Sequence, residues 1–551
     1  MSYADQRGAF RRPGSVGRVG PRAGLVGIVV ALACACGSPD RSGAPGEAET
    51  PPRPNILFIF TDDHATHAVG AYGGYLEEFA PTAHIDRLAR EGMLFRNAFV
   101  GNSICVPSRA TILTGTHSHI NGAITNRVAF DGAQPTFPKL LQQAGYQTAL
   151  IGKWHLQSEP TGFDHWEILT GFGGQGSYYN PDFASPAGST HVTGYTTDIV
   201  TEKALEWLRE DRDPRPFLLM VQHKAPHIPW EPGPEHLTLF EGVTIPEPPT
   251  LFDDYEGRNS AAAHTYMTIE RHMGPKILML QPPATLTAEQ LELWNAVYGP
   301  RNAAYREENP QGPDRVRWRY QRYIKDYLRT IASVDDGVGR LLDYLDRTGL
   351  ADSTVVVYAS DQGFFLGNHG WYDKRWMYEE SLRFPLIMRW PGVIGPGAED
   401  RHLVQNLDLA PTFLDMAGVD IPDRVQGRSL LPLLRGREPV AWRDAIFYEY
   451  YEHGAHGVPR QHGVRTDRYK LIHYPTTGER ELFDLREDPH ELQSVHDNPA
   501  YANVLDRMER RLTELRTRFA VPEGQPGPEM ENEPGSGPAR ERPRPAGPEG
   551  G

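Results

Sequence analysis

Two apolar segments that each end in acidic residues constrain the fold of this chain more than any other feature. Residues 54–60 read Pro-Asn-Ile-Leu-Phe-Ile-Phe and lead into Thr-Asp-Asp-His. Residues 354–358 read Thr-Val-Val-Val-Tyr and lead into Ala-Ser-Asp-Gln-Gly. Uninterrupted apolar runs of this length are typical of strands buried on both faces of a parallel sheet. Open α/β sheets bind their ligands at the carboxyl ends of such strands.

Weaker patterns predict the elements around these two strands. Apolar runs at 148–152 and 216–221 predict two more strands, and apolar residues spaced three and four apart from 320 to 345 predict a helix. Alternating strands and helices favour a parallel α/β sheet over residues 54–420. A polar, proline-rich stretch at about 240–315 is expected to be an insertion over that sheet.

The pattern changes after the α/β region. Short apolar runs at 444–451 and 469–474 predict strands, and a helical pattern follows at 499–519. We therefore expect a smaller C-terminal subdomain over residues 421–522. Residues 523–551 are rich in Gly, Pro and charge and are expected to form a disordered tail.

Composition excludes several classes of protein. With 39% hydrophobic and 23% charged residues in 551, the chain is not a polytopic membrane protein. The net charge of −15 gives no general attraction to nucleic acid, so an anionic substrate requires local cations or a metal. The three cysteines are Cys34, Cys36 and Cys105, and only the last falls in the expected folded region, which excludes a disulfide framework.

Residues 1–36 read as a targeting segment. Five arginines precede the apolar run 23–36, which is too short to span a bilayer but suits the core of a signal peptide. The small residues around Cys34 and Cys36 resemble a lipoprotein signal, and a plain cleaved signal is the alternative. Both predict export from the cytoplasm, to the periplasm or the cell surface, with a polar linker at 37–53.

The acids after the two apolar strands predict a metal site. Asp62 and Asp63 follow the first strand, and Asp361 and Gln362 follow the second. Carboxylates that meet at one sheet edge repel one another unless a cation lies between them. Carboxylate and amide oxygens suit Ca²⁺, whereas no Cys/His pattern favours zinc. For an isolated acidic pair, a role in a turn or helix cap is the simpler explanation, and its recurrence at two strand ends argues against that.

A second pattern places a cysteine at a helix start. Cys105 precedes Pro107, which suits the first helical turn, and residues 110–113 continue the helix. Helix amides at this end favour a negative group, and Arg109 adds a cation for tetrahedral oxyanions. A buried structural cysteine and a thiolate nucleophile with a histidine partner are the alternatives, and spacing does not decide between them.

Residues 105–115, Cys-Val-Pro-Ser-Arg-Ala-Thr-Ile-Leu-Thr-Gly, resemble the sulfatase signature. The resemblance extends over about residues 54–520, because further family motifs follow in the family's order. These motifs are Asp62-Asp63, Gly152-Lys153-Trp154-His155, Lys224-Ala-Pro-His227, Ser360-Asp361-Gln362-Gly363 and Tyr372-Asp-Lys374. It implies an alkaline-phosphatase-like α/β sandwich with a mixed, mostly parallel central sheet and a small C-terminal α+β subdomain with an antiparallel sheet.

The same resemblance implies a role for each matching residue. A separate maturation enzyme would oxidise Cys105 to formylglycine, whose hydrate would attack sulfur. Arg109 would stabilise the hydrate and His155 would hold or deprotonate it. The remaining implied roles are Ca²⁺ binding by Asp62, Asp63, Asp361 and Gln362, sulfate binding by Lys153, His227 and Lys374, and protonation of the leaving alcohol by His227 or Lys374.

Specificity signals are weaker. Residues 365–381 and 460–473 resemble sulfatases that act on glycans, most closely N-acetylglucosamine-6-sulfatases and mucin-desulfating enzymes, while iduronate-2-sulfatases share much of the first stretch. Arg460 and His462 are candidate sugar contacts, although as turn residues of the C-terminal sheet they need no such role. The alternatives are arylsulfatase or iduronate-2-sulfatase specificity, a phosphonate or phosphate ester hydrolase on the same scaffold, and a catalytically silent glycan-binding lipoprotein.

Overall fold

The computed structural model describes residues 53–210 and 214–524. The expected targeting segment, nearly all of the linker at 37–53 and nearly all of the tail at 523–551 lie outside these residues. Within the described residues, no helix is both long and apolar enough to cross a membrane.

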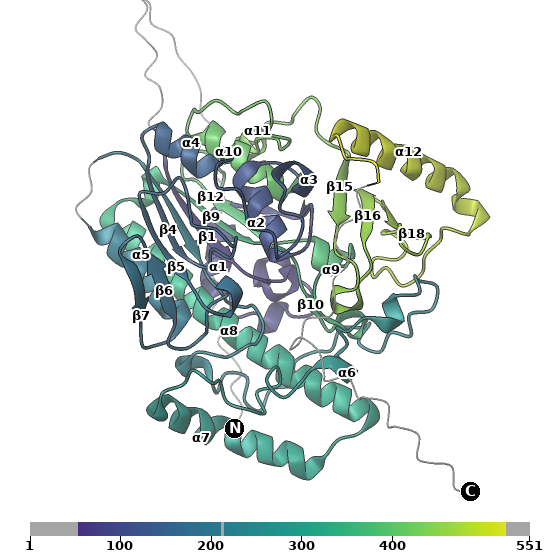
Figure 1. Ribbon diagram of the computed structural model, residues 1–551, viewed down its shortest axis with the longest axis horizontal. Coiled ribbons are helices and arrows are strands. Elements are labelled where there is room, and N and C mark those ends of the chain that lie inside the picture. Colours follow the sequence, from purple (N-terminus) through teal and green to yellow (C-terminus); the bar gives the residue numbers. More distant parts are fainter. Residues whose placement is uncertain (1–52, 211–213, 525–551) are drawn as a thin grey trace, which may run out of the picture. The chain divides into compact units, whose positions relative to one another are not determined.

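A ten-stranded, mixed but mostly parallel sheet forms the centre of the fold (Figure 1), in the order β13-β2-β12-β9-β1-β8-β4-β5-β6-β7. Strand β1 (Asn55–Thr61) lies between β8 (Phe217–Gln222) and β9 (Thr354–Ser360) and is parallel to both. The other strands are β2 (Met93–Phe95), β4 (Gln147–Gly152), β5 (His165–Leu169), β6 (Asp182–Ser185), β7 (Gly188–His191), β12 (Leu386–Arg389) and β13 (Ala398–Asp400).

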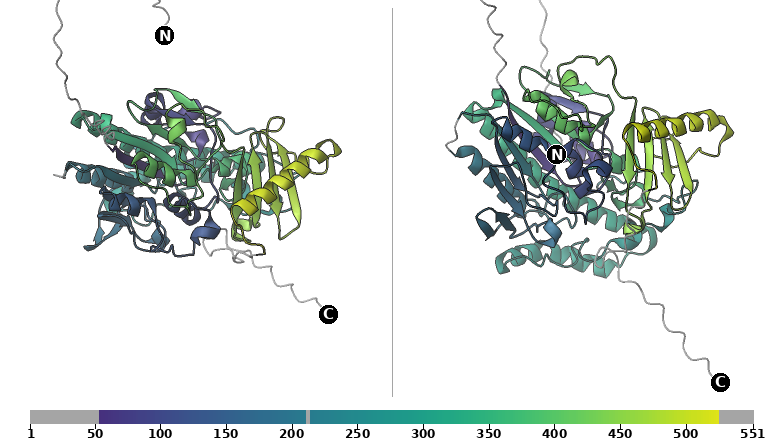
Figure 2. Two further views of the ribbon diagram at one scale, coloured as in Figure 1. Left: turned by 90° about the horizontal axis from the view of Figure 1, so that it is seen from above. Right: turned by 45° about the horizontal axis from the view of Figure 1, so that its top comes forward.

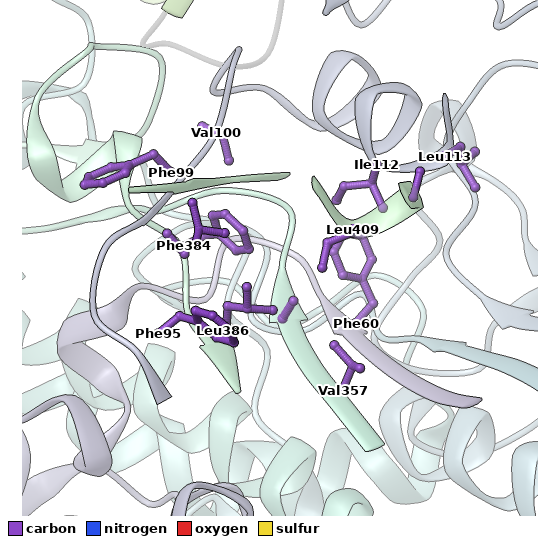
Figure 3. Close-up of a cluster of buried hydrophobic side chains, with 14 of the residues drawn as sticks. Phe60, Phe95, Phe99, Val100, Ile112, Leu113, Val357, Phe384, Leu386 and Leu409 are labelled. Atoms are coloured by element: carbon purple, nitrogen blue, oxygen red, sulfur yellow. The ribbon is translucent and has the colours of Figure 1, made fainter. Parts of the chain in front are cut away.

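Alternate side chains of β1 supply the two faces of this sheet. Phe58 and Phe60 pack in one buried cluster with residues of α2 (Cys105–Thr114), α4 (Phe137–Gln143) and α10 (Leu409–Met416). Figure 3 shows Phe60 close to Ile112 of α2 and Leu409 of α10. Leu57 and Ile59 pack in a second cluster on the opposite face. That cluster includes residues of α1 (Ala83–Glu91), α5 (Thr196–Arg209) and α8 (Gly312–Thr348).

A second, smaller sheet forms the C-terminal part (Figures 1 and 2). Its strands are antiparallel and follow chain order, β15 (Ala445–Tyr450), β16 (Gln461–Thr466), β17 (Tyr469–Tyr474) and β18 (Glu479–Asp484). Helix α12 (Ala502–Arg518) lies across one face of this sheet. Met508, Leu512 and Leu515 of the helix join a buried cluster with Val464 and Leu471.

The remaining elements are short apart from one helix. The stretch at 240–315 contains α7 (Ala288–Glu308) and the single turn α6 (Ile269–His272). The other short elements are α3 (Ser118–Asn121), α9 (Glu379–Leu382), α11 (Leu431–Leu434), β3 (Ala98–Phe99), β10 (Phe365–Leu366), β11 (Tyr372–Asp373) and β14 (Val404–Gln405). The predicted α/β sandwich with a small antiparallel C-terminal sheet is confirmed.

Candidate active site

The acidic residues meet because β1 and β9 are parallel neighbours in register. Thr61 of β1 is paired with Ser360 of β9, so the next residues, Asp62 and Asp361, leave the sheet side by side. Both carboxylates are fully buried. Gly363 keeps this edge compact, because a Cβ there would lie 2.1 Å from the carbonyl oxygen of Glu380. The strand ends therefore bring the predicted acids together, as the sequence indicates.

Three carboxylates form the centre of the site. Oxygens of Asp62, Asp63 and Asp361 all lie within 4.8 Å of one another. The Asp63 main-chain N–H donates to Asp361 Oδ1 at 3.1 Å, which orients the two acids. Asp63 has a φ of 68°, a left-handed backbone conformation that residues other than glycine rarely adopt. Burial raises the pKa of Asp63 to about 6 despite the adjacent Lys374 ammonium.

This cluster fits a hard divalent cation. Gln362 donates from Nε2 to Asp63 Oδ1 at 2.6 Å, while its Oε1 is buried without a hydrogen-bond partner. The structure thus places an unused amide oxygen beside three carboxylates, the oxygen-rich set that Ca²⁺ prefers. Cations already gather around these acids: Lys374 Nζ lies 2.6 Å from Asp63 Oδ1, and Lys153 Nζ contacts Asp62 Oδ2.

Cys105 is the first residue of α2 and faces the carboxylates. Its Sγ lies 3.5 Å from Asp62 Oδ1 and 3.9 Å from Gln362 Nε2. Ligand atoms of Cys105, Asp62 and His227 lie within 4.8 Å of one another. Burial and the nearby carboxylates raise the pKa of the Cys105 thiol to about 12, although Lys374 and Arg109 oppose the shift. An unmodified thiol here stays protonated at neutral pH, which argues against a thiolate nucleophile.

Arg109 lies one turn further along α2 and links the site to the sheet. Its Nε lies 3.2 Å from Asp361 Oδ2. Its Nη1 donates to the Lys153 carbonyl oxygen at 2.8 Å and to Gln222 Oε1 at 2.9 Å. The guanidinium is 3% exposed, so these contacts fix its plane. Gln222, the last residue of β8, is a supporting residue that the sequence analysis did not identify.

Lys153 and His155 follow the end of β4. The turn requires Gly152, because its φ is +111° and a Cβ there would lie 1.9 Å from the Gln222 carbonyl oxygen. Lys153 Nζ donates to Gln175 Oε1, on a glycine-rich loop that also packs against His155. Burial and the surrounding cations lower the pKa of His155. The imidazole is therefore neutral, as proton acceptance requires.

His227 and Lys374 complete the ring of predicted residues. His227 Nδ1 lies 2.6 Å from the Ile228 carbonyl oxygen, which leaves Nε2 directed at the acids, 3.8 Å from Asp63 Oδ2. Lys374 Nζ lies 2.6 and 2.7 Å from the two oxygens of Asp63. The structure therefore brings together, in one buried cluster, the ten residues expected to catalyse or to bind metal.

A polar cluster beside Lys374 was not anticipated. Asp373 and Arg375 form an ion pair of 2.6 Å, and His456 Nδ1 lies 3.3 Å from Asp373 Oδ2. All three have positive φ, at 79°, 93° and 54°. Such backbone conformations in residues other than glycine gather at functional sites. His456 lies between β15 and β16, far from Lys374 in the sequence, so no local motif connects it with the site.

The two candidate sugar contacts lie at β16. Arg460 precedes the strand and donates from Nε to the Tyr451 carbonyl oxygen at 2.9 Å. His462 lies within the strand, with its ring 5.5 Å from that of His473. Because strand residues alternate, His462 shares the face of Val464, which packs against α12. His462 thus belongs to the side of the small sheet that α12 covers.

Two family profiles match this chain. A family profile described as Sulfatase matches residues 54–419. A second profile, described as N-sulphoglucosamine sulphohydrolase, C-terminal, matches residues 367–518. The two matches overlap over residues 367–419, the segment that contains Lys374.

Among individual relatives, an N-acetylglucosamine-6-O-sulfatase of Bacteroides thetaiotaomicron is 44% identical over 92% of both chains. The human N-acetylglucosamine-6-sulfatase is 29% identical over 75% of this chain and 70% of its own length. A solved structure described as a complex with its substrate D-glucosamine-2-N,6-O-disulfate superposes with a TM-score of 0.83 at 45% identity, covering 86% of this chain and 99% of the other. A phosphonate monoester hydrolase from Silicibacter pomeroyi shares the fold, with a TM-score of 0.64 at 23% identity.

Proposed function

The chain belongs to the sulfatase family, and from that premise we propose that it removes the 6-O-sulfate of a glucosamine-type sugar through a formylglycine made from Cys105. The observation that carries the substrate is the 44% identity, over 92% of both chains, to a relative named for N-acetylglucosamine-6-O-sulfate. The superposed structure that holds D-glucosamine-2-N,6-O-disulfate supports the same sulfate position.

The modified residue and a calcium ion supply chemistry that ordinary side chains lack. Formylglycine at position 105, as its hydrate, would supply one hydroxyl as the nucleophile toward sulfur and a second hydroxyl that allows sulfate to be released again. Asp62, Asp63, Asp361 and Gln362 would hold the calcium ion through oxygen ligands. The unused Gln362 Oε1 and the three converging carboxylates support that assignment.

The remaining residues bind and orient the sulfate. Arg109 is fixed by Asp361 and Gln222 and stabilises the hydrate. Lys153, Lys374 and His227 surround the position of Cys105 and bind sulfate oxygens. Displacement at sulfur places charge on the leaving oxygen, and preorganised cations stabilise that charge. His227 or Lys374 protonates the leaving alcohol, and neutral His155 accepts the proton of the hydrate.

The sugar binds beside Lys374. Asp373, Arg375 and His456 present one carboxylate, one guanidinium and one imidazole next to the sulfate site. Such a mixed set of donors and acceptors suits the hydroxyl groups of a pyranose, which both donate and accept hydrogen bonds. We therefore propose that this cluster, and not His462, binds the sugar ring of the substrate. The ring of His462 lies on the α12 side of the small sheet.

The chain is further proposed to act outside the cytoplasm. Residues 1–36 have the basic start and apolar core of an export signal, and Cys34 or Cys36 is the candidate lipid attachment site. A maturation enzyme that acts on sulfatases is the implied transient partner. Sulfated glycans at the cell surface or in the periplasm are the implied substrates.

Sulfate release tests the proposal directly. Protein co-produced with a formylglycine-generating enzyme and loaded with calcium is assayed by ion chromatography of free sulfate. N-acetylglucosamine-6-sulfate and glucosamine-2-N,6-O-disulfate are compared with N-acetylglucosamine-3-sulfate and a 2-sulfated iduronate. We expect kcat/KM for the 6-sulfates to exceed that for the other esters by about 100-fold or more, because only these place sulfur at residue 105 with the ring in contact with Asp373.

Two variants control this assay. Cys105→Ala lacks the nucleophile and should lose at least about 1,000-fold in rate, whereas Ser189→Ala on the exposed β7 should match the parent. Faster turnover of an aryl phosphonate than of the matched aryl sulfate would reassign the chain to phosphonate hydrolysis. Glycan binding that survives Cys105→Ala, with no sulfate released from any ester, would identify a binding protein instead.

A further inference from the structure

Lys224 is a buried cation that the assigned chemistry leaves unused. The residue lies two positions after the end of β8 and is only 5% exposed. Within the described residues, its ammonium makes no hydrogen bond and no ion pair. The contact it does make is with the ring of Tyr178, whose centroid lies 5.1 Å from Nζ. A buried ammonium without a hydrogen-bonding anion is costly, so its position requires an explanation.

Lys224 lies beside His227 of the site, because its carbonyl oxygen accepts from the His227 N–H and its ammonium lies over Tyr178, which also contacts His227. Burial, Lys153 and Lys374 lower the pKa of both His155 and His227, and the charge of Lys224 adds a smaller effect in the same direction. Burial lowers the pKa of Lys224 to about 8, and Glu231, Asp63 and Cys105 oppose that shift, with Glu231 contributing most. Lys224 therefore interacts electrostatically with His155, His227 and Asp63.

The other three cations of the site differ from Lys224 in one respect. Arg109 contacts Asp361, Lys153 contacts Asp62, and Lys374 contacts Asp63. Among the described cations around Cys105, Lys224 alone lacks a carboxylate within contact distance. Glu231 is the acid that most raises the pKa of Lys224, yet no hydrogen bond or ion pair joins the two. Burial raises the pKa of Glu231 itself to about 7.

The fixed surroundings of Lys224 favour an ammonium held ready for a ligand. Tyr178 is buried, and its hydroxyl donates to the His227 carbonyl oxygen at 2.6 Å, which ties the ring under Lys224 to the segment that carries His227. The His227 main-chain N–H in turn donates to the Lys224 carbonyl oxygen at 3.0 Å. Lys224 and His227 are thus positioned as one unit.

We propose that Lys224 is a further substrate-binding residue, whose ammonium takes an oxygen of the sulfate group that the enzyme transfers to water. The proposal rests on the proposed function. The ligand is a tetrahedral oxyanion, and an ammonium can donate to any of its oxygens without a fixed orientation. A bound oxyanion supplies the counter-charge that the ammonium lacks in this structure.

The test uses inorganic sulfate, so that it does not depend on turnover. Calcium-loaded parent protein and Lys224→Met are titrated with sodium sulfate by calorimetry, and sulfate is also measured as a competitive inhibitor of sulfate ester hydrolysis. We expect Lys224→Met to weaken sulfate binding by about 10- to 100-fold, the loss of one charge-assisted hydrogen bond, with unchanged calcium affinity. KM for the sulfate ester should rise in parallel.

Lys203→Met is the matched control. Lys203 also lies over an aromatic ring, Phe183, at 5.2 Å, but it has a carboxylate partner, Glu167, at 2.6 Å. It should bind sulfate like the parent. Sulfate affinity within twofold of the parent in folded Lys224→Met would overturn the proposal. If Lys224→Met does not fold, Lys224→Gln is titrated under the same criteria, and failure of both to fold would assign the lysine to the fold and overturn the proposal as well.

This design separates the two levels of inference. A parent protein that binds inorganic sulfate through Lys224 but releases no sulfate from any sugar would overturn the proposed function and leave the binding role intact. If the parent desulfates 6-sulfated glucosamine while Lys224→Met binds sulfate normally, the proposed function stands and the binding role of Lys224 is overturned.

Discussion

Cys105 has three chemically distinct fates, and its neighbours decide between them. A structural cysteine would face apolar side chains, whereas this thiol faces Asp62 and Gln362. A thiolate nucleophile needs a lowered pKa, whereas burial raises the pKa of this thiol to about 12. Both observations favour oxidation of Cys105 to an aldehyde. The nucleophile is then a hydroxyl of the aldehyde hydrate, so no ionised thiol is required.

Short sequence motifs identified the charged residues of the site but not the residues that position them through hydrogen bonds. Asp62, Asp361, Arg109 and Lys374 each lie in a short recognisable segment. Gln222, in contrast, is one polar residue at the end of an apolar strand, and it contacts Arg109 only because β8 lies beside β1. Contacts between distant segments leave no local signal, so such supporting residues require the structure.

Removal of one acid tests the metal assignment. Asp361→Ala deletes a carboxylate that orients both Asp63 and Arg109, so we expect calcium affinity to fall by about 10- to 100-fold and sulfate release to fall at least as much. Calcium titration by calorimetry and ion chromatography of released sulfate measure the two effects. Asp343→Ala, at a side chain 63% exposed on α8, is the control. Unaltered calcium dependence and rate in Asp361→Ala would refute the ligand assignment.

At the scale of elements, predictability followed the strength of the apolar pattern. Helix α8 buries a long stripe of side chains and was located from its spacing, whereas α7 was not. Only Trp294, Tyr298 and Asn302 of its 21 residues are buried, and Pro300 lies within it. A helix that buries so few side chains has almost no periodic signal. Strand β16 has no apolar pattern for a different reason: most of its residues are polar, although four of the six are buried.

The loop before Lys374 predicts a measurable pH dependence of stability. His369 is fully buried near Asp253, Arg258 and Glu380. Burial disfavours its charged form, but the hydrogen bond to Asp253 and the negative charge of Glu380, 3.7 Å away, prevail and raise its pKa. A pKa raised in the folded state stabilises the fold below about pH 6.5, the unfolded value, and this contribution is lost as pH rises through the folded value.

His369→Asn tests this contribution, and asparagine tolerates the φ of 57° at this position. The deficit in unfolding free energy of the variant, measured by urea denaturation, should be larger at pH 6 than at pH 9. His117 provides a control of opposite sign, because burial lowers its pKa to about 3. The deficit of His117→Asn should therefore shrink as pH falls below about 6.5. A deficit for His369→Asn that is independent of pH would contradict the assignment.

At the scale of the whole molecule, the small sheet supports the segment that contains Lys374. Tyr448 of β15 donates to the Arg375 carbonyl oxygen at 2.7 Å, and Gln461 of β16 accepts from the Met377 N–H at 2.9 Å. Lys470 of β17 donates to the Met377 carbonyl oxygen at 2.8 Å. The sequence indicated a separate C-terminal subdomain, but only the structure connects it with the site.

Lys470→Met tests this connection. Lys470 Nζ is fully buried between Glu379 at 2.9 Å and Glu491 at 2.7 Å. Its loss leaves the buried Glu491 without its cation, while Glu379, whose side chain is 15% exposed, keeps Arg465, so we expect about 3–5 kcal/mol less unfolding free energy in urea. Sulfate release should also fall, because the Lys374 segment loses a donor. Arg468→Met, whose side chain is 36% exposed, should cost much less unfolding free energy than Lys470→Met. Equal effects of the two variants would exclude the proposed support.

The most direct test of the account is the mass of the peptide that contains residue 105. Conversion of the thiol to an aldehyde lowers the mass by about 18 Da. In protein isolated from a host with a sulfatase-maturing enzyme, we predict this lower mass at Cys105 in the fraction that releases sulfate. An unmodified thiol in that active fraction would contradict the account.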